Sequence, residues 1–268
     1  ITEAGFGADM GAERFFNVKC RISGLKPDAA VLVVTVRSLK SHSGLYKIVP
    51  GKPLPEGMLE ENPADVEAGA TNMKKHIEIV RNFGVQPVVA INAFPTDFDS
   101  EHEAIRRIAE EAGARVAIHH GVAEGGKGTV DLANVVAEAC DDVSNLEYTY
   151  DLEDSLETKL EKVATKVYGA DGISIAPAAA KQLKRFADLG YSQLPVVIAK
   201  THLSISSDAS LKGAPTGWTL PVREVSLAAG AGYVYAICGT MRTMPGLSKS
   251  PAAERIGFDE NGTMIGLS

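Results

Sequence analysis

The most constraining feature of this sequence is the apolar run VVAI at 88–91, which is followed at once by polar and ring-bearing residues. A short run of this kind, preceded by Gly84 and broken by Pro95, predicts a strand buried on both faces of a parallel sheet. Ligands of doubly wound sheets bind just beyond the carboxyl ends of such strands. The segment 92–97 therefore stands where a ligand would bind, although an ordinary turn with Phe94 in the core explains this window equally well.

The same pattern recurs along the chain. Apolar runs at 29–36, 116–118, 195–200 and 233–238 are separated by helical patterns, and Gly-, Pro- or polar-rich segments follow them. This succession predicts an α/β fold with mostly parallel, doubly wound sheets whose sites lie at strand ends. A length of 268 residues exceeds most single cores, so we expect two or three subdomains.

Three helices are predicted, two of them from the signals at their ends. Asn62 and Pro63 predict the start of a helix that runs to Phe83 and is closed by Gly84. A second helix is predicted from Ser100 to Ala112, with Ser100 and Glu103 as a capping box. A third is predicted over 12–20, with two phenylalanines facing inward.

Composition narrows the function. A net charge of −7 and a pI near 5.4 argue against a general nucleic-acid binder. The three cysteines are far apart, with no CxxC pair and no metal-ligand spacing, so we expect buried thiols, a reducing cytoplasm and no metal site. No apolar run reaches the length of a membrane span and no signal peptide precedes Ile1, which also favours the cytoplasm.

Two further segments have alternative interpretations. The strand at 29–36 ends in the Thr35 hydroxyl and the cations of Arg37 and Lys40, which would meet a ligand's phosphates; alternatively, Arg37 and Lys40 extend into solvent. The Gly-rich segment 2–11 is either an anion-binding loop or a plain tight loop. It is not a P-loop, because GxxxxGK[ST] occurs nowhere in the 268 residues. His119 and His120 are interpreted as loop or surface residues.

Five segments in this order closely resemble the formate–tetrahydrofolate ligase family: TEAGFGADMGAERFF, DAAVLVVTVRSLK, PVVAINAFPTD, GAPTGWTLPVREVSLAAGAGYV and GTMRTMPGLSKSPAAE. The likeness extends from Ile1 to Ser268 and includes the ending DENG-x-x-x-GL. It implies ATP- and Mg²⁺-dependent ligation of formate to tetrahydrofolate through formyl phosphate, giving formyltetrahydrofolate. It also implies a cytoplasmic homotetramer, and it leaves the use of a monovalent cation open.

The resemblance also implies a domain plan. The chain looks like the C-terminal half of such an enzyme, and we expect its partner to be an N-terminal half that carries the P-loop. Residues 1–70 would be the remnant of a P-loop-NTPase-like nucleotide domain, 71–166 a second α/β domain with the pterin pocket, and 167–268 a third with an adenine-contacting loop. On this reading the chain alone would be inactive.

The site residues follow from the matched positions. Phe94 and Pro95 would form one wall of the pterin pocket, with Asn92 and Asp97 as polar partners. The family pattern has a tryptophan on the opposite wall, at the position occupied here by Val122. This departure makes the aromatic sandwich one-sided and puts the affinity for folate in doubt.

The remaining matched positions belong to the other substrates. Ala214, Pro215 and Thr216 resemble the adenine-contacting segment, whereas the neighbouring Trp218 is expected to be structural. Glu3 and Arg37 are the candidate catalytic residues. With Phe6, Asp9 and Thr35 they would border the cleft where formyl phosphate forms.

Two other functions stay open at this point. The chain would be a non-catalytic folate- and nucleotide-binding module if phosphate chemistry has been lost, as the absence of GxxxxGK[ST] favours. It would be a nucleotide-binding protein with a different acceptor if Val122 abolishes the pterin site.

Overall fold

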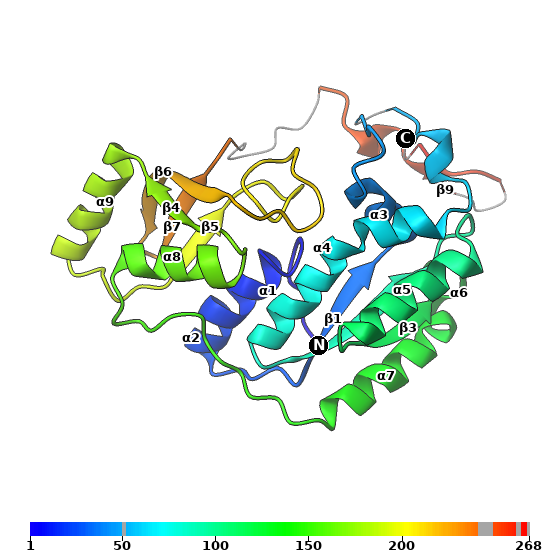
Figure 1. Ribbon diagram of the computed structural model, residues 1–268, viewed down its shortest axis with the longest axis horizontal. Coiled ribbons are helices and arrows are strands. Elements are labelled where there is room, and N and C mark those ends of the chain that lie inside the picture. Colours follow the sequence, from blue (N-terminus) through cyan, green and yellow to red (C-terminus); the bar gives the residue numbers. More distant parts are fainter. Residues whose placement is uncertain (50–51, 241–248, 261–263, 267–268) are drawn as a thin grey trace.

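The computed structural model describes residues 1–49, 52–240, 249–260 and 264–266. Two lobes lie side by side, each built on its own sheet, and the N-terminal helices lie between them (Figure 1). The α-helices are α1 (Gly11–Arg14), α2 (Arg21–Ser23), α3 (Val36–His42), α4 (Pro63–Asn82), α5 (Asp99–Glu111), α6 (Gly121–Glu124), α7 (Val130–Cys140), α8 (Leu156–Lys166) and α9 (Pro177–Asp188). The other helices are the π-helix η1 (Phe15–Cys20) and the 3-10 helices η2 (Glu56–Met58), η3 (Gly125–Thr129) and η4 (Ala252–Glu254). The strands are β1 (Ala29–Val34), β2 (Gln86–Asn92), β3 (Arg115–His119), β4 (Gly172–Ile175), β5 (Val196–Ala199), β6 (Thr219–Ala228), β7 (Tyr233–Cys238), β8 (Gly257–Phe258) and β9 (Met264–Ile265).

The first lobe has three layers. Its sheet has the order β1-β2-β3 with all strands parallel, as the sequence predicted. Val89 and Ile91 of β2 are fully buried against α4 and α5, and α7 packs on the other face of the sheet. Because β2 is covered on both sides, its apolar run needs no alternation of polar residues.

Helix α4 confirms the end signals in the sequence. It begins at Pro63, and Asn62 caps it by accepting the Asp65 N–H at 3.4 Å. It ends before Gly84, whose φ of +74° suits a residue without a Cβ.

Two local predictions were wrong. Helix α5 begins at Asp99 with Phe98, not Ser100, as its N-cap, and the residue three positions after the cap is Glu101, not Glu103, whose Oε2 accepts the Phe98 N–H. Strand β1 is not buried on both faces, because it lies at the edge of the sheet and leaves Val31 and Val33 43% and 66% exposed.

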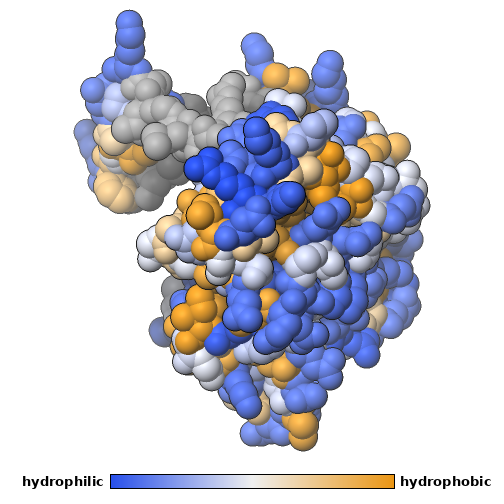
Figure 2. All heavy atoms as spheres, turned by 90° about the vertical axis from the view of Figure 1, so that its left-hand side faces the viewer, coloured by the Kyte–Doolittle hydropathy of each residue, from blue (hydrophilic) through white to orange (hydrophobic). Residues whose placement is uncertain are grey.

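The second lobe has a mixed sheet of order β4-β6-β7-β5. Its β4–β6 and β5–β7 pairs are parallel, whereas β6 and β7 form an antiparallel hairpin. Helices α8 and α9 pack against this sheet. The face of the molecule on which α9 lies is predominantly hydrophilic, with hydrophobic residues in separate small areas (Figure 2).

The two lobes share a hydrophobic core. Phe16 of η1 is buried and packs on Phe83 at the end of α4, with ring centroids 4.9 Å apart. The same core continues into the strands of the second lobe. The helix predicted over 12–20 is thus confirmed as part of one helical stretch, α1–η1–α2, that fills the junction.

The predicted boundary near residue 70 falls inside α4, and β1 and β2 belong to one sheet. The predicted boundary near 166 coincides with the end of α8, which packs on the second sheet. The strands of the described residues thus group around two main sheets, and the division into 1–70, 71–166 and 167–268 stays a prediction.

Cys20 and Cys238 are buried free thiols, as expected, but Cys140 at the end of α7 is exposed. Within the described ranges, no helix combines the length and apolarity needed to span a membrane.

Candidate functional site at the carboxyl edge of the first sheet

The register of the parallel strands brings together the segments that follow β1, β2 and β3, which we call the exits of these strands. Val34 of β1 pairs with Ile91 of β2, and Asn92 of β2 pairs with His119 of β3. Because all three strands are parallel, the segments that follow them emerge at one edge of the sheet. Asn92, Phe94, Pro95 and Asp97 of the predicted pterin site lie at the exit of the middle strand, β2, whereas Val122 follows β3.

The exit of β2 is a closed turn. Asp97 Oδ2 accepts the Phe94 N–H at 3.0 Å, and the Asp97 N–H donates to Phe94 O at 3.0 Å. The ring of Phe94 is half-buried, and Pro95 at the tip of the turn is exposed. Asn92 ends the strand, and the next N–H, of Ala93, donates to His119 O at 3.2 Å. The turn is therefore held by its own contacts and by β3.

Arg37 reaches this turn from the first turn of α3. Its guanidinium lies over the Phe94 ring, 4.6 Å from the centroid, and donates to Thr96 Oγ1 at 2.8 Å. Its Nε is buried and has no partner among the described residues. The structure thus brings together Arg37 and the predicted pterin wall.

The other candidate catalytic residue lies elsewhere. Glu3 is exposed in the segment before α1, and that segment runs along η1, where Lys19 Nζ lies 3.5 Å from Thr2 Oγ1. Phe6 of the same segment stacks on His202 with centroids 5.3 Å apart, on the side of the second lobe. Glu3 and Arg37 are therefore placed by different parts of the fold.

Val122 lies in α6, directly after β3, on the same edge of the sheet. Val122 is 89% exposed, so almost none of its surface packs against the rest of the chain. His120 is exposed in the loop after β3, as predicted, whereas His119 is half-buried and is the last residue of β3 rather than a loop residue.

The predicted adenine loop docks on the first lobe although it belongs to the second. The Gly213 N–H donates to His42 Nδ1 at 3.3 Å, and Asn72 Nδ2 donates to Gly213 O at 3.1 Å. Ala214 and Pro215 are half-buried and Thr216 is exposed. Trp218 Nε1 donates to Pro215 O at 3.0 Å, which supports its expected structural role.

Helix α3 therefore touches both candidate binding segments. Arg37 in its first turn contacts the Phe94 turn, and His42 at its end contacts the Gly213 loop. These residues are five apart, or about 8 Å along a helix axis. Burial, with Lys212 and His76 as lesser causes, lowers the pKa of His42 to about 4, which favours the neutral ring that accepts the Gly213 N–H.

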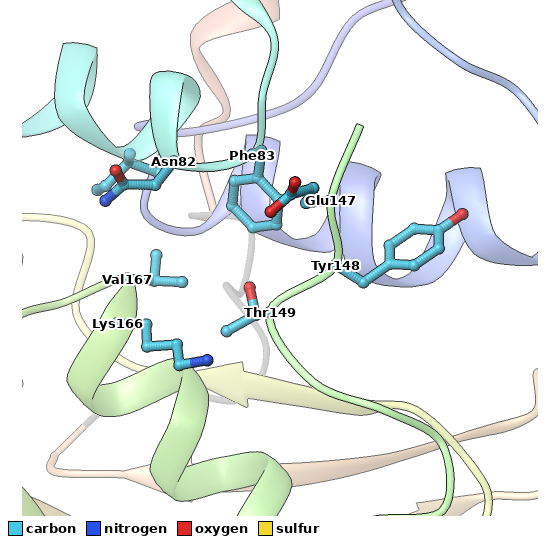
Figure 3. Close-up of a pocket in the computed structure, with 8 residues that line it drawn as sticks. Asn82, Phe83, Glu147, Tyr148, Thr149, Lys166 and Val167 are labelled. Carbon is cyan, nitrogen blue, oxygen red and sulfur yellow. The ribbon is translucent and has the colours of Figure 1, made fainter. Parts of the chain in front are cut away.

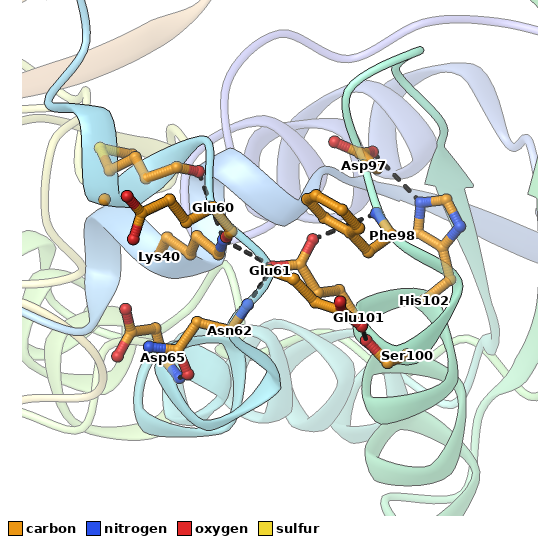
Figure 4. Close-up of polar contacts among 12 residues, drawn as sticks. Lys40, Glu60, Glu61, Asn62, Asp65, Asp97, Phe98, Ser100, Glu101 and His102 are labelled. Atoms are coloured by element: carbon orange, nitrogen blue, oxygen red, sulfur yellow. Dashed lines mark hydrogen bonds and ion pairs between the residues drawn. The ribbon is translucent and has the colours of Figure 1, made fainter.

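Sequence reasoning missed the buried polar pairs that support this edge. Neither of the two interpretations of Lys40 was right, because its Nζ is buried, 2.5 Å from Glu101 Oε1, and donates to Glu60 O and Met58 O (Figure 4). His102 Nε2 lies 3.1 Å from Asp97 Oδ2. An amphipathic helical pattern predicts that a residue faces inward but not which side chain it will meet, so the sequence carried no signal for these pairs.

A second polar cluster lies between the lobes. Lys200, at the exit of β5, is buried with its Nζ 2.6 Å from Asp9 Oδ2 and also donates to Ser204 O at 2.7 Å. Burial raises the pKa of the nearby Glu13 to about 7, partly offset by its hydrogen bond from Asn17. Asp9, predicted to border the phosphate cleft, is thus engaged in a buried ion pair.

A cavity of about 330 Å³ lies between the first lobe and helix α8 of the second. It is enclosed by the end of α4, the segment 147–149 and the end of α8, and Figure 3 shows Lys166 and Val167 lining it with Asn82 and Phe83. None of the predicted site residues lines it. Because it lies near the amino ends of the strands, it does not coincide with the expected binding edge.

Comparison with known proteins identifies the family. The whole chain, residues 1–268, matches the family model described as Formate--tetrahydrofolate ligase. The curated protein of that name from Cutibacterium acnes is 69% identical over 267 residues, and that from Saccharopolyspora erythraea is 63% identical over 268 residues. Formate--tetrahydrofolate ligase 3 of Rubrobacter xylanophilus is 57% identical over 276 residues.

These alignments cover 100% of this chain but only 47% or 48% of each relative. The chain thus spans about half the length of the curated relatives it matches. Part of the matched sequence, 241–248 and 261–263, lies outside the described residues, including most of GTMRTMPGLSK and the middle of the DENG-x-x-x-GL ending. The match over the full chain confirms the resemblance seen in the sequence: the chain belongs to the formate–tetrahydrofolate ligase family.

Proposed function

We propose that this chain contributes the pterin-binding edge and the adenine-contacting loop to an ATP-dependent formate–tetrahydrofolate ligase. The family match over all 268 residues supports the activity. The observation that carries the site is the arrangement of Phe94, whose backbone is fixed by Asp97 and whose ring lies beside Arg37. A flat aromatic wall held in place in this way suits a pterin ring, because offset stacking adds about 1 kcal/mol beyond area burial.

In this proposal formate and ATP form formyl phosphate, and the pterin-linked amine of tetrahydrofolate then attacks the formyl carbon. The part of this chain is to bind and orient the reactants, because such a transfer depends on positioning and charge stabilisation. Phe94 and Pro95 orient the pterin ring, and the loop at 214–216 contacts adenine. The neutral His42 anchors that loop through Gly213.

Mg²⁺ belongs to the proposal as a cofactor of ATP. Among the described residues, no three His, Cys, Asp or Glu side chains converge on a metal-sized site. The proposal therefore assigns no Mg²⁺ ligand in this chain and no step through the ion. The wider proposal also includes a cytoplasmic homotetramer and a polypeptide that supplies a P-loop, as the family resemblance implies.

The second candidate is a folate- and nucleotide-binding module without phosphate chemistry. It is favoured by one observation, that no GxxxxGK[ST] occurs in the 268 residues. The two candidates differ in turnover and not in binding, so an activity measurement separates them.

The first test is the intact mass of the purified protein under native and denaturing conditions, with N-terminal sequencing of each band. If a polypeptide carrying a P-loop co-purifies, we expect formyltetrahydrofolate and ADP to form from formate, ATP and tetrahydrofolate. If this chain purifies alone and binds tetrahydrofolate without turnover, the binding module is the better description.

The second test addresses the site. Phe94→Ala should weaken tetrahydrofolate binding about ten-fold, because it removes both stacking and buried ring area. Phe258→Ala is the matched control, since Phe258 of β8 is 69% exposed. Equal affinity of Phe94→Ala and the unsubstituted chain, measured by titration calorimetry, would reject the assignment of the pterin wall.

A further inference from the structure

One carboxylate oxygen closes the turn that carries Phe94. Asp97 Oδ2 accepts the Phe94 N–H at 3.0 Å and lies 3.1 Å from His102 Nε2. The side chains of Asp97 and His102 are 3% and 9% exposed. Asp97 is thus directed into the protein, away from any ligand at the sheet edge.

The position of His102 is fixed because the start of α5 is firmly anchored. His102 belongs to the first turns of α5, and the neighbouring Glu101 holds that end of the helix in three directions (Figure 4). Glu101 Oε1 lies 2.5 Å from Lys40 Nζ and accepts the Asn62 N–H at 2.9 Å, while its Oε2 accepts the Phe98 N–H at 3.3 Å. The position of Asp97 is therefore set by α5 through His102.

The contact works in either charge state of the imidazole. Nε2 carries a proton in the Nε2 tautomer of the neutral ring and in the imidazolium, and in both it donates to Asp97 Oδ2. A charge-assisted hydrogen bond that is buried from water is among the stronger contacts in a protein. It restricts the carboxylate to the geometry that captures the Phe94 N–H.

The backbone of Phe94 in turn fixes its ring. Arg37 lies over one side of the ring, so a flat ligand would stack on the side that Arg37 leaves open. The position of that side depends on the φ and ψ of Phe94, which the bond from its N–H to Asp97 constrains. Holding a binding wall in its bound geometry before the ligand arrives lowers the entropy cost of binding.

We propose that Asp97 and His102 are positioning residues that preset Phe94 for a reduced pterin, an inference that rests on the proposed function of Phe94. It gives Asp97 a different role from the direct polar contact that its matched position suggests. Two hydrogen bonds connect the binding wall to α5: Asp97 Oδ2 accepts one from the Phe94 N–H and the other from His102 Nε2.

One variant weakens these hydrogen bonds, a second removes their donor from His102, and a third keeps that donor. Asp97→Asn removes the charge from the acceptor, and His102→Phe keeps a ring but loses the donor. Each should raise the dissociation constant of tetrahydrofolate about ten-fold, as measured by titration calorimetry. His102→Gln supplies an N–H donor and should stay within about two-fold of the unsubstituted chain.

Two controls separate positioning from loss of stability. Asp99→Asn alters an exposed carboxylate two residues from Asp97 and should leave the affinity unchanged. Ile105→Val removes a methylene group from a fully buried residue of α5, which destabilises the core without touching the turn. Weakened binding in Ile105→Val equal to that in Asp97→Asn would show that lost stability alone explains the effect, and would overturn the proposal.

The inference can also be tested without a ligand, and so independently of the proposed pterin site. Hydrogen exchange at the Phe94 amide should become about ten-fold faster in Asp97→Asn and in His102→Phe, and should return toward the original rate in His102→Gln. Unchanged exchange in the first two variants would overturn the inference whatever happens to binding.

The Phe94→Ala variant distinguishes the two possible failures. If Phe94→Ala weakens binding but the Asp97 and His102 variants do not, the pterin wall stands and the positioning role is rejected. If Phe94→Ala binds as before while Phe94 exchange responds to Asp97 and His102, the turn is held as described but the proposed pterin site is wrong.

Discussion

Lys200 Nζ lies 2.6 Å from Asp9 Oδ2 in the buried space between the two lobes. The two residues are 191 positions apart, and their side chains are 0% and 7% exposed. A buried charge without its partner costs far more than a surface charge, because it cannot recover its hydration. This pair therefore makes the junction of the lobes sensitive to the loss of either residue.

We expect Lys200→Met to lower the free energy of unfolding by about 3–5 kcal/mol, because it leaves the Asp9 carboxylate buried and unpaired. Urea titration measures the change. Adding Asp9→Asn should restore part of the loss, while Lys74→Met, at an exposed position on α4, should change stability by less than about 0.5 kcal/mol. A double variant no more stable than Lys200→Met would argue against an unpaired charge as the cause.

Glu13 should make stability fall as the pH rises. Burial raises the pKa of its carboxyl from 4.5 to about 7, so between those values the unfolded chain loses a proton that the folded chain retains. Stability from this group is complete below pH 4.5 and is lost as the pH passes 7, by about 3 kcal/mol in total. Between pH 5 and pH 7.5 the free energy of unfolding, measured by urea titration, should decrease less in Glu13→Gln than in the parent. An equal decrease in both proteins would refute this account.

His42 should act in the opposite direction. Its pKa is lowered from 6.5 to about 4, chiefly by burial, so between those values the unfolded chain gains a proton that the folded chain does not. Stability from His42 is therefore present above pH 6.5 and is lost as the pH falls toward 4. His42→Gln retains an acceptor for the Gly213 N–H but does not titrate, so its stability should decline less than the parent's between pH 6.5 and pH 4.5.

The role of Arg37 can be determined from whether its substitution changes KM or kcat, in a preparation that shows ligase turnover. Because Arg37 contacts Phe94 and Thr96, Arg37→Ala should raise KM for tetrahydrofolate about three- to ten-fold and leave kcat nearly unchanged. Arg37→Lys should recover little, since a lysine lacks the planar group that stacks on the ring. A fall in kcat at constant KM would instead support the catalytic role predicted from the sequence.

Gly69 marks the close approach of α3 and α4. A Cβ at this position would lie 1.8 Å from Leu39 O, so Gly69→Ala must push the helices apart and should cost roughly 1–3 kcal/mol. Gly230→Ala is the control, because a Cβ there meets nothing within 4 Å. Thermal unfolding of both variants measures the difference, and equal midpoints would contradict the close packing.

The sequence was sufficient for much of what depends on neighbours along the chain, although it misplaced the start of α5. It predicted the α/β class, the limits of α4 from Asn62 and Gly84, and the turn after β2 that carries Phe94 and Pro95. It also predicted the family, because several segments match in order over all 268 residues. Periodicity, caps and matched motifs are local signals, and they do not need a folded chain.

Only the tertiary structure decided which side chains meet. The sequence carried no sign that Arg37 would lie on Phe94, and it assigned Lys40 to phosphates or solvent, yet Lys40 pairs with Glu101, 61 positions away. It treated the strand at 29–36 as buried, yet the position of β1 at the edge of its sheet exposes Val33. Helical and strand patterns determine which face of an element turns inward, but the partner on that face is decided by the order of the strands and the crossing of the helices, which bring distant segments together.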